Sequence, residues 1–427
     1  MTPEIKQRIE QIKNGEIPKG YKKGKLGIVP EDWEEVCFSS LFTSTSDYTD
    51  DLEKHPLYSL TIEDGITAKT DRYNRAHLVK KENSYKIVRP NDYAYNPMNI
   101  RFGAVARHKG DTPVAISGYY DIFTTVHQSD LPFMDNFLTC GAMITYYNKV
   151  STGSLVEKQR VHFSDFLKFS LPLPPLAERE RIAKILSTQD KVIECYEKKI
   201  EQFKQMKKYY LQNMFPKRGE TVPKIRFKGF TDPWEQRKLD NLAQFTKGTG
   251  YSKGELKESG TPIILYGRLY TKYETVITSI DTFTDAKPDS VYSRGGEVIV
   301  PASGETAEDI SIASVVEKSG VLLGGDLNII TPSTTIDSAF LAISISNGTP
   351  HNNIAKMAQG KSVVHLHNTD LKKIDLSYPC YEEQRQISDF FKRYDNLITL
   401  HQRKLEEEKK KKKALQQLLL TGIVRTN

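Results

Sequence analysis

Basic side chains gather in short stretches rich in tyrosine and glycine, such as Leu265-Tyr-Gly-Arg-Leu-Tyr-Thr-Lys-Tyr273. An arginine can contact guanine through two hydrogen bonds, and a lysine can neutralise a phosphate. Loops of this kind are therefore candidates for reading DNA, although solvated surface is the more common meaning of a basic cluster. The candidate DNA-contacting residues are Lys69, Arg72, Arg101, Arg107, Lys109, Lys247, Arg268, Lys272, Ser303 and Lys361.

A near match to a nucleotide-binding P-loop lies at residues 355–362 (AKMAQGKS). Alanine stands where a P-loop has its first glycine, and the residues that follow are typical of a strand. A P-loop leads instead from a strand into a helix. A glycine turn before a strand is the better interpretation.

Asn96, in the segment Asn96-Pro97-Met98-Asn99, offers an amide of the kind with which amino-methyltransferases hold a flipped base. The segment lacks the second proline and the aromatic residue of that motif. No glycine-rich loop for a methyl-donor cofactor precedes it. An enzyme fragment that uses Asn96 is therefore only a minor alternative, which unchanged methylation after Asn96→Ala would exclude.

His365 and His367 alternate on an expected strand, so their imidazoles point to one face. A metal site needs at least a third ligand nearby, and none is apparent. The cysteines Cys37, Cys140, Cys195 and Cys380 are far apart and are expected to be reduced thiols. No catalytic centre, metal site or bound cofactor is predicted in this chain.

Charge and length limit the class of protein. The chain has 427 residues and a net charge of +7. Residues 25–170 hold 16 Lys and Arg against 19 Asp and Glu, and residues 234–374 hold 14 against 16, so the positive excess lies outside these stretches. No apolar run approaches the roughly 18 residues of a membrane span, and the cytoplasm is the expected location.

An internal repeat organises the whole chain. The segment that begins at Leu171 matches the segment that begins at Leu376 without a gap, at an offset of 205 residues. Asp190 matches Asp395 under this offset, and Trp33 and Trp234 open the two halves. The repeat predicts two globular units, each followed by one long helix.

Both copies carry apolar residues on alternating steps of four and three, which is typical of a coiled coil. We expect the two helices to pair with each other as an antiparallel coiled coil. Polar residues at Gln189, Lys207, His401, Glu408 and Lys412 interrupt the pattern; they set the register or leave a face for a third partner. The predicted helix-pairing residues are Ile182, Leu186, Ile193, Tyr196, Ile200, Phe203, Ile387, Phe391, Tyr394, Ile398, Leu405, Leu415 and Leu419.

The globular stretches contain short strand-like runs between Gly, Pro, Asn and Asp, which predicts an α+β fold with strand-rich cores. Helices are expected near residues 136–148 and 337–346. The predicted organisation is an N-terminal helical segment (1–24), a first strand-rich domain (25–170), a central long helix (171–215), a linker (216–233), a second strand-rich domain (234–374), and a distal long helix with its tail (375–427).

This organisation resembles the specificity subunits of Type I restriction-modification systems. The most specific segments are LPLPPLAE at 171–178, YPCYEEQ at 378–384, GETAEDI at 304–310, FKGFTDPWE at 227–235 and LLLTG at 418–422. Arg179 replaces an expected glutamine, and Cys380 replaces an expected second proline. Both departures concern helix entry alone.

The resemblance implies that each strand-rich domain is a target recognition domain that reads one half of a bipartite, asymmetric DNA site. It implies that the helices dock methylation subunits, two of them being expected, and that restriction subunits join the complex. S-adenosylmethionine, ATP and Mg²⁺ are then expected on those partners. The open alternative from another class is a coiled-coil scaffold with two protein-interaction modules and no DNA contact.

The segment LEEEKKKKKALQQLLL at 405–420 holds the densest charge in the chain. Glu406, Glu407 and Glu408 each precede a lysine by four residues, a spacing that stabilises helices. The run is therefore predicted to be a solvated face of the distal helix, with contact to a partner subunit or to DNA phosphate as a secondary role.

Overall fold

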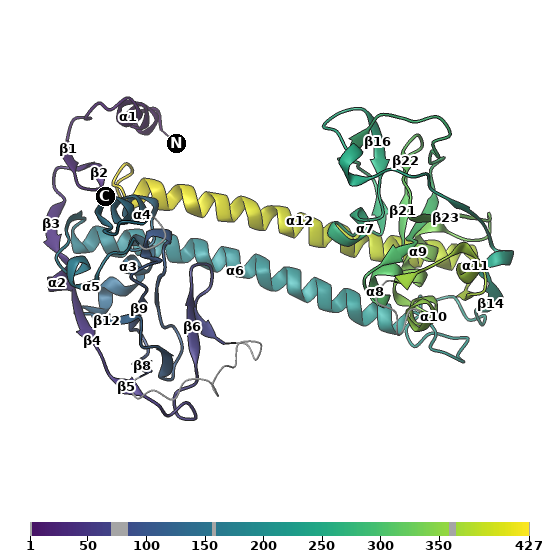
Figure 1. Ribbon diagram of the computed structural model, residues 1–427, viewed down its shortest axis with the longest axis horizontal. Helices are drawn as coiled ribbons and strands as arrows, with labels where there is room; N and C mark the ends of the chain where they lie inside the picture. The colour runs from purple at the N-terminus through teal and green to yellow at the C-terminus, as the bar shows by residue number, and fades with distance from the viewer. Residues whose placement is uncertain (1, 70–83, 156–158, 358–363, 427) are drawn as a thin grey trace. The chain divides into compact units, whose positions relative to one another are not determined.

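The computed structural model describes residues 2–69, 84–155, 159–357 and 364–426. The chain divides into two compact units (Figure 1). Unit 1 comprises residues 1–196 and 404–427, and unit 2 comprises residues 197–403. Each unit therefore contains one strand-rich domain and half of each long helix.

The N-terminal segment forms helix α1 (Pro3–Lys13), as the sequence predicts. Pro3 is at the first helical position, where its missing N–H costs nothing. Thr2 accepts a hydrogen bond from the Ile5 amide at 3.4 Å. The helix ends at Asn14, and Gly15 follows in the left-handed region with φ of 79°.

The first strand-rich domain is built on two antiparallel sheets. One has the order β10 (Val105–Arg107), β9 (Tyr93–Tyr95), β12 (Asp121–Thr125), β4 (Phe42–Thr45). The other has the order β11 (Val114–Ser117), β8 (Tyr85–Val88), β5 (Tyr48–Thr49). Three further pairs are β1 (Tyr21–Gly24) with β2 (Gly27–Pro30), β6 (Tyr58–Thr61) with β7 (Gly65–Ala68), and β3 (Glu34–Cys37) with β13 (Ser170–Leu173). The short helices are α2 (Phe38–Leu41), η2 (Ile100–Phe102), η3 (Gln128–Asp130), α3 (Leu131–Phe137), α4 (Gly141–Val150) and α5 (Phe163–Phe166).

The second strand-rich domain keeps the same order of four antiparallel strands in its larger sheet and adds a fifth strand at one edge. Its larger sheet has the order β15 (Ala243–Lys247), β23 (Leu327–Pro332), β19 (Glu297–Pro301), β21 (Ser314–Val316), β17 (Val276–Ile277). A smaller sheet joins β18 (Phe283–Thr284), β16 (Thr261–Ile264) and β22 (Leu322–Leu323), and two pairs join β14 (Glu235–Lys238) to β25 (Asp375–Tyr378) and β20 (Ser303–Gly304) to β24 (Val364–His365). The short helices are η5 (Leu239–Asn241), η6 (Lys253–Glu255), α7 (Arg268–Thr271), α8 (Ala307–Ile310), α9 (Ser338–Asn347), α10 (Thr349–Met357) and α11 (Asn368–Leu371).

Two details differ from the sequence prediction. The helix expected near 136–148 is two helices, α3 and α4, because the chain turns between Leu138 and Cys140. Residues 171–173 were predicted to belong to the segment of the central long helix, yet they form β13 together with Ser170, and β13 pairs with β3. A strand is favoured there because Pro172, Pro174 and Pro175 exclude helical hydrogen bonding.

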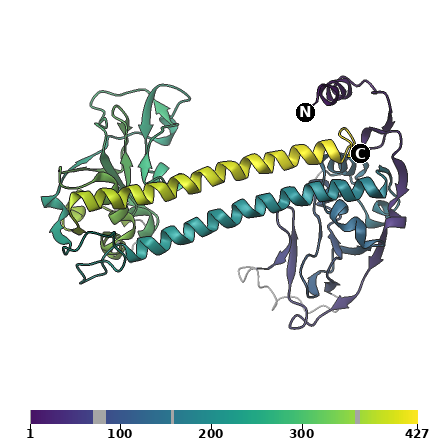
Figure 2. The ribbon, with the colours of Figure 1, turned by 180° about the vertical axis from the view of Figure 1, so that it is seen from behind.

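The long helices are α6 (Leu176–Asn213) and α12 (Tyr381–Leu419). In unit 1, the start of α6 packs against the end of α12, with Ile182, Leu186 and Leu419 buried in one core. In unit 2, the end of α6 packs against the start of α12: the Phe203 ring lies 6.4 Å from Tyr394 and 5.2 Å from His401. The predicted antiparallel pairing is therefore confirmed in each unit (Figure 2).

The predicted helix-pairing positions differ in burial along the helices. Ile182, Leu186, Ile193, Ile200, Ile387, Phe391 and Leu419 are buried. Tyr196, Phe203, Tyr394, Ile398, Leu405 and Leu415 are half-buried. Five of these buried residues belong to the domain cores, whereas Ile193 and Ile200 are buried between them along α6.

The polar interruptions of the pattern pair across the helices. Lys207 forms an ion pair with Asp395 in unit 2, and Lys412 lies 2.5 Å from Asp190 in unit 1. Lys412 is the repeat equivalent of Lys207, and Asp395 is the repeat equivalent of Asp190, at the offset of 205 residues. The lysine is on α6 and the aspartate on α12 in unit 2, and the reverse holds in unit 1. Gln189 adds a 2.5 Å hydrogen bond to the Glu408 carboxylate. The interruptions therefore fix the register of the helix pair.

Exchanging the partners of one ion pair tests this register. Asp395→Lys alone is expected to destabilise unit 2 by about 1 kcal/mol, since it opposes two cations on facing helices. Lys207→Glu together with Asp395→Lys is expected to recover most of that loss, as urea unfolding of the single and double variants measures. Additive losses in the double variant would contradict the pairing.

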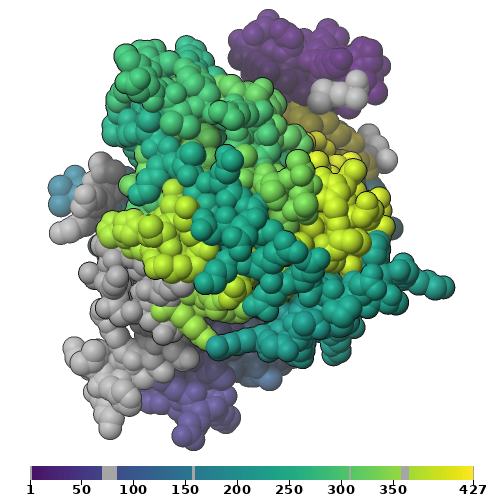
Figure 3. All heavy atoms as spheres, turned by 90° about the vertical axis from the view of Figure 1, so that its right-hand side faces the viewer, coloured from purple at the N-terminus to yellow at the C-terminus, as the bar shows by residue number. Residues whose placement is uncertain are grey.

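Each long helix begins with a buried glutamate that an arginine holds. In unit 1, Arg425 donates two 2.8 Å hydrogen bonds to Glu178 and also contacts Asp32, while the Trp33 indole lies 3.3 Å from Glu178. In unit 2, Arg226 donates two 2.8 Å hydrogen bonds to Glu383, the repeat equivalent of Glu178. Arg226 lies in the segment that follows α6. Residues 217–222 of this segment are exposed, and teal atoms of this part of the chain are visible on the surface in Figure 3.

Among the described residues, no helix is long and apolar enough to cross a membrane.

Candidate nucleic-acid interface

A groove of 740 Å³ opens on the first strand-rich domain. Strand β10 ends at Arg107, and the loop after it carries Lys109, so both cations line the groove. The facing wall is the hairpin of β6 and β7, which contributes Tyr58 and Asp64. The structure thus brings two of the predicted residues to one concave surface.

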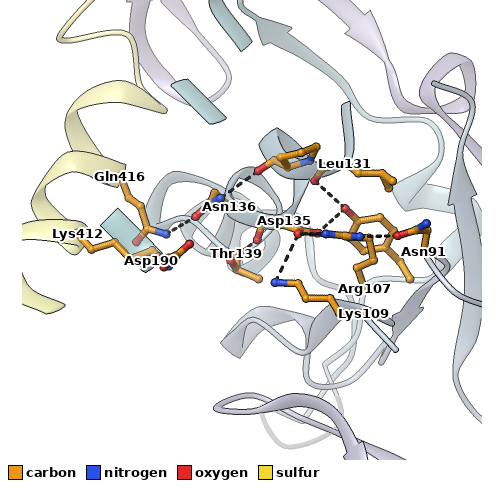
Figure 4. Close-up of polar contacts among 12 residues, drawn as sticks. Asn91, Arg107, Lys109, Leu131, Asp135, Asn136, Thr139, Asp190, Lys412 and Gln416 are labelled. Carbon is orange, nitrogen blue, oxygen red and sulfur yellow. Dashed lines mark hydrogen bonds and ion pairs between the residues drawn. The ribbon is translucent and has the colours of Figure 1, made fainter. Parts of the chain in front are cut away.

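Asp135 of α3 holds both cations (Figure 4). Its carboxylate accepts hydrogen bonds from Arg107 Nε at 2.9 Å and from Arg107 Nη2 at 2.7 Å. The Lys109 ammonium lies 3.6 Å from the same carboxylate. The Arg107 and Asp135 side chains are only 17% and 14% exposed, whereas Lys109 is 70% exposed. Lys109 is therefore the cation that reaches solvent, and Arg107 is the one that is fixed.

Two further polar groups complete this cluster. The Tyr93 hydroxyl donates to Asp135 at 2.8 Å, and burial raises the pKa of Tyr93, so the phenol stays protonated. Arg107 Nη1 donates to the Asn91 side chain at 2.5 Å. Asn91 has φ of 72°, a conformation that asparagine tolerates better than most residues. Hydrogen bonding to Asp135 raises the pKa of Arg107, which keeps the guanidinium charged.

The other predicted residues of this domain lie apart from that cluster. Lys69 follows β7 and is exposed. Arg101 lies in η2, is only 6% exposed, and donates to Gln159 at 2.6 Å. Arg72 lies outside the described residues.

In the second domain, Arg268 and Lys272 flank α7 and share Asp281. Arg268 is 9% exposed, forms ion pairs with Asp281 and Glu274, and donates to the Ser279 carbonyl at 2.9 Å. Lys272 is half exposed and lies 2.8 Å from Asp281. Hydrogen bonds from Lys272 and Arg268 lower the pKa of Asp281 to about 2. The arrangement repeats that of the first domain, because a fixed arginine and a more exposed lysine again share one aspartate.

Ser303 and Lys247 lie on other elements of the second domain. Ser303 is on β20, and its carbonyl accepts a 2.5 Å hydrogen bond from Tyr270 of α7. Lys247 is exposed at the end of β15. Lys361 lies outside the described residues, as does most of the P-loop-like segment.

The remaining motifs have structural roles. The Asn96 side chain is buried and accepts hydrogen bonds from the amides of Met98 and Asn99 at 3.1 and 3.2 Å, so it shapes the turn before η2. The rings of His365 and His367 stack 6.4 Å apart. Within the described ranges, no group of three or more His, Cys, Asp or Glu residues is placed to hold a metal ion.

Sequence reasoning missed the two aspartates that organise these clusters. Asp135 lies 28 residues from Arg107, and Asp281 lies 13 residues from Arg268. Neither separation is a helical or strand spacing, so no local pattern marks the pairs. The repeat gives no help here, because its ungapped match covers the helices and not the domains.

Comparisons with known proteins agree with the internal repeat. The family model described as "Type I restriction modification DNA specificity domain" matches residues 30–205 and again residues 231–409. The type I restriction enzyme MjaVIII specificity subunit of Methanocaldococcus jannaschii is 26% identical over 271 residues, which cover 61% of this chain and 63% of that protein. A protein of the same organism described as the type I restriction enzyme MjaX specificity subunit is 25% identical over 431 residues, covering 95% of this chain and 96% of that protein.

Solved structures show a similar fold. A chain from a structure on complex assembly and conformational transition of the type I R-M system superposes with a TM-score of 0.55 at 14% identity, covering 93% of this chain and 99% of that chain. The type I restriction-modification S subunit of M. genitalium superposes with a TM-score of 0.51 at 15% identity, covering 93% and 97%.

Proposed function

Because the chain belongs to the family of Type I restriction modification DNA specificity domains, we propose that each of its two recognition domains reads one half of a bipartite, asymmetric DNA site. The chain is then a non-catalytic recognition subunit. The observation that carries the proposal is the double match to the specificity domain. The two domains share the order of four core strands but differ in sequence, which suits a site whose halves differ.

The geometry supports a specific division of labour within each domain. The exposed ammonium groups of Lys109 and Lys272 suit contact with phosphates. Their neighbours Arg107 and Arg268 hold the carboxylates of Asp135 and Asp281 in place. Lys69 and Lys247 offer further exposed cations. The buried Arg101 is better suited to fixing η2 than to reaching a base.

The proposed partners are double-stranded DNA, two methylation subunits docked on the long helices, and restriction subunits. S-adenosylmethionine, ATP and Mg²⁺ would be bound by those partners. Methylation sequencing of DNA from cells that carry the assembled complex tests the proposal, with a single bipartite motif as the expected result. Methylation without any bipartite motif would overturn it.

A gel shift with salt titration separates this function from the scaffold alternative. Phosphate contacts release counterions, so binding of the assembled complex to DNA should weaken steeply as salt rises. A scaffold without DNA contact would give no shift at any salt concentration.

Removing the shared aspartate tests the first recognition domain. Asp135→Ala frees Arg107 and Lys109 and leaves a buried guanidinium without its carboxylate. We expect affinity for the cognate site to fall by about tenfold, or about 1.4 kcal/mol, and discrimination at one half-site to relax. Asp165→Ala is the matched control, since the ion pair of Asp165 among the described residues is with the exposed Lys168. Equal loss at both half-sites would contradict a local role.

A further inference from the structure

Two grooves, one in each unit, are lined by lysines at equivalent positions of the internal repeat. The first lysine groove, of 1020 Å³, lies in unit 1 between α4 and the last turns of α12, and Lys409, Lys412 and Lys413 line it. The second lysine groove, of 530 Å³, lies in unit 2 between the end of α6 and the junction of α9 and α10, and Lys204, Lys207 and Lys208 line it. The offset of 205 residues converts each lysine of the second groove into one of the first.

The match extends beyond the lysines. Gln212 of the second groove corresponds to Gln417 of the first, and Ile398 corresponds to Ile193. The walls from the two domains also correspond in place, because Thr139 to Lys149 lies at the junction of α3 and α4, and Ser346 to His351 lies at the junction of α9 and α10. The same helix surface is therefore presented as a concave site twice, although the sequences of the walls differ.

Both grooves have a positive rim and an apolar floor. The first adds Lys25 and Lys149 to its rim, against a single lining carboxylate, Asp190, which Lys412 already holds at 2.5 Å. The floor of the first includes Ile144 and Ile193, and that of the second includes Leu211 and Ile398.

This chemistry points to one kind of occupant. An interface with DNA backbone is dominated by polar and charged contacts and does not need an apolar floor. An amphipathic protein segment places apolar side chains on such a floor and acidic side chains against such a rim. We propose that each lysine groove docks an acidic, amphipathic segment, and that the two segments come from two copies of one partner protein. The identity of that partner as the methylation subunit rests on the proposed function.

Charge reversal at the exposed rim tests the proposal in the full chain, co-purified with the methylation subunit of its system. Lys409→Glu with Lys413→Glu alters the first groove, and Lys204→Glu with Lys208→Glu alters the second. Native mass spectrometry of each complex counts the bound methylation subunits. We expect one copy in place of two for either double variant and none for the quadruple variant, with affinity at the altered groove at least about tenfold weaker.

Two matched controls come from the same helices. Lys410→Glu with Lys411→Glu, and Lys198→Glu with Lys199→Glu, make the same charge change at exposed lysines that line neither groove. Both should keep two copies. Circular dichroism of each variant shows whether a loss of docking comes from misfolding. Variants with glutamine in place of glutamate remove the positive charge without reversing it, so they should lose less affinity for the methylation subunit.

Several outcomes would overturn the inference. One is that the groove variants bind two methylation subunits at unchanged affinity. Another is that the control variants lose as much affinity for the methylation subunit as the groove variants do. A third is that the unaltered chain binds no methylation subunit. Salt-dependent loss of DNA binding with two copies retained would instead assign the grooves to phosphates. Groove-dependent docking in a complex that lacks a bipartite methylation motif would count against the proposed function alone.

Discussion

Replacing Arg226 by methionine is expected to lower the free energy of unfolding of unit 2 by about 3–5 kcal/mol. The Glu383 side chain is 1% exposed and would keep its charge in an apolar surrounding without its guanidinium partner. Methionine retains most of the aliphatic packing of arginine, so the loss reports the charge pair. Urea unfolding monitored by tryptophan fluorescence measures this loss. A Trp33→Phe background leaves Trp234 as the tryptophan that reports the unfolding of unit 2.

Arg237→Met is the matched control in the same domain. Arg237 pairs with Glu235 while both side chains are more than half exposed, so its loss should cost less than about 0.5 kcal/mol. If Arg226→Met cost no more than this control, the buried pair would not stabilise the start of α12.

Exchanging the first recognition domain for that of a relative is expected to change one half of the methylated site and leave the other half unchanged. Apart from the β1–β2 pair, the strands of this domain lie within residues 34–173, and β3 pairs with β13 at the point where the chain enters and leaves. Residues 33–173 should therefore be exchanged together, so that both strands of this pair come from one parent. Methylation at the original site should fall by at least about 100-fold, since several mismatched base pairs each cost about 1–3 kcal/mol.

The reciprocal exchange supplies the control. Residues 234–378 are closed in the same way by β14 and β25, and their exchange should alter only the other half-site. Methylation sequencing reads both halves at once. If either exchange changed both halves, the two domains would not read DNA independently.

The long helices were predictable because their signals are local and repeated. Alternating steps of four and three mark Ile182 to Leu186 and Ile387 to Phe391, and prolines mark the helix starts. The antiparallel direction was predicted because the domain between the two helices is long enough for the chain to turn back alongside the first helix. The exchanged pairs Lys207–Asp395 and Lys412–Asp190 follow from the same offset, but only the structure shows that these residues meet.

The candidate site was much less predictable. Charge and composition mark Arg107 and Lys109 as basic residues without showing that Asp135 holds them. Arg101 and Lys109 belong to the same basic stretch of the sequence, yet Arg101 is buried in η2 whereas Lys109 extends into solvent. Such differences depend on contacts between distant segments, which no short-range pattern records.

The division of the chain into units also orders its folding during synthesis. Unit 2 is one continuous segment, whereas unit 1 needs Leu415, Leu419 and Leu420 to cover Ile182 and Leu186. The ribosome makes those leucines only after all of unit 2. An apolar surface of unit 1 therefore stays uncovered while unit 2 emerges, which makes the nascent chain a substrate for chaperones and proteases until α12 is complete.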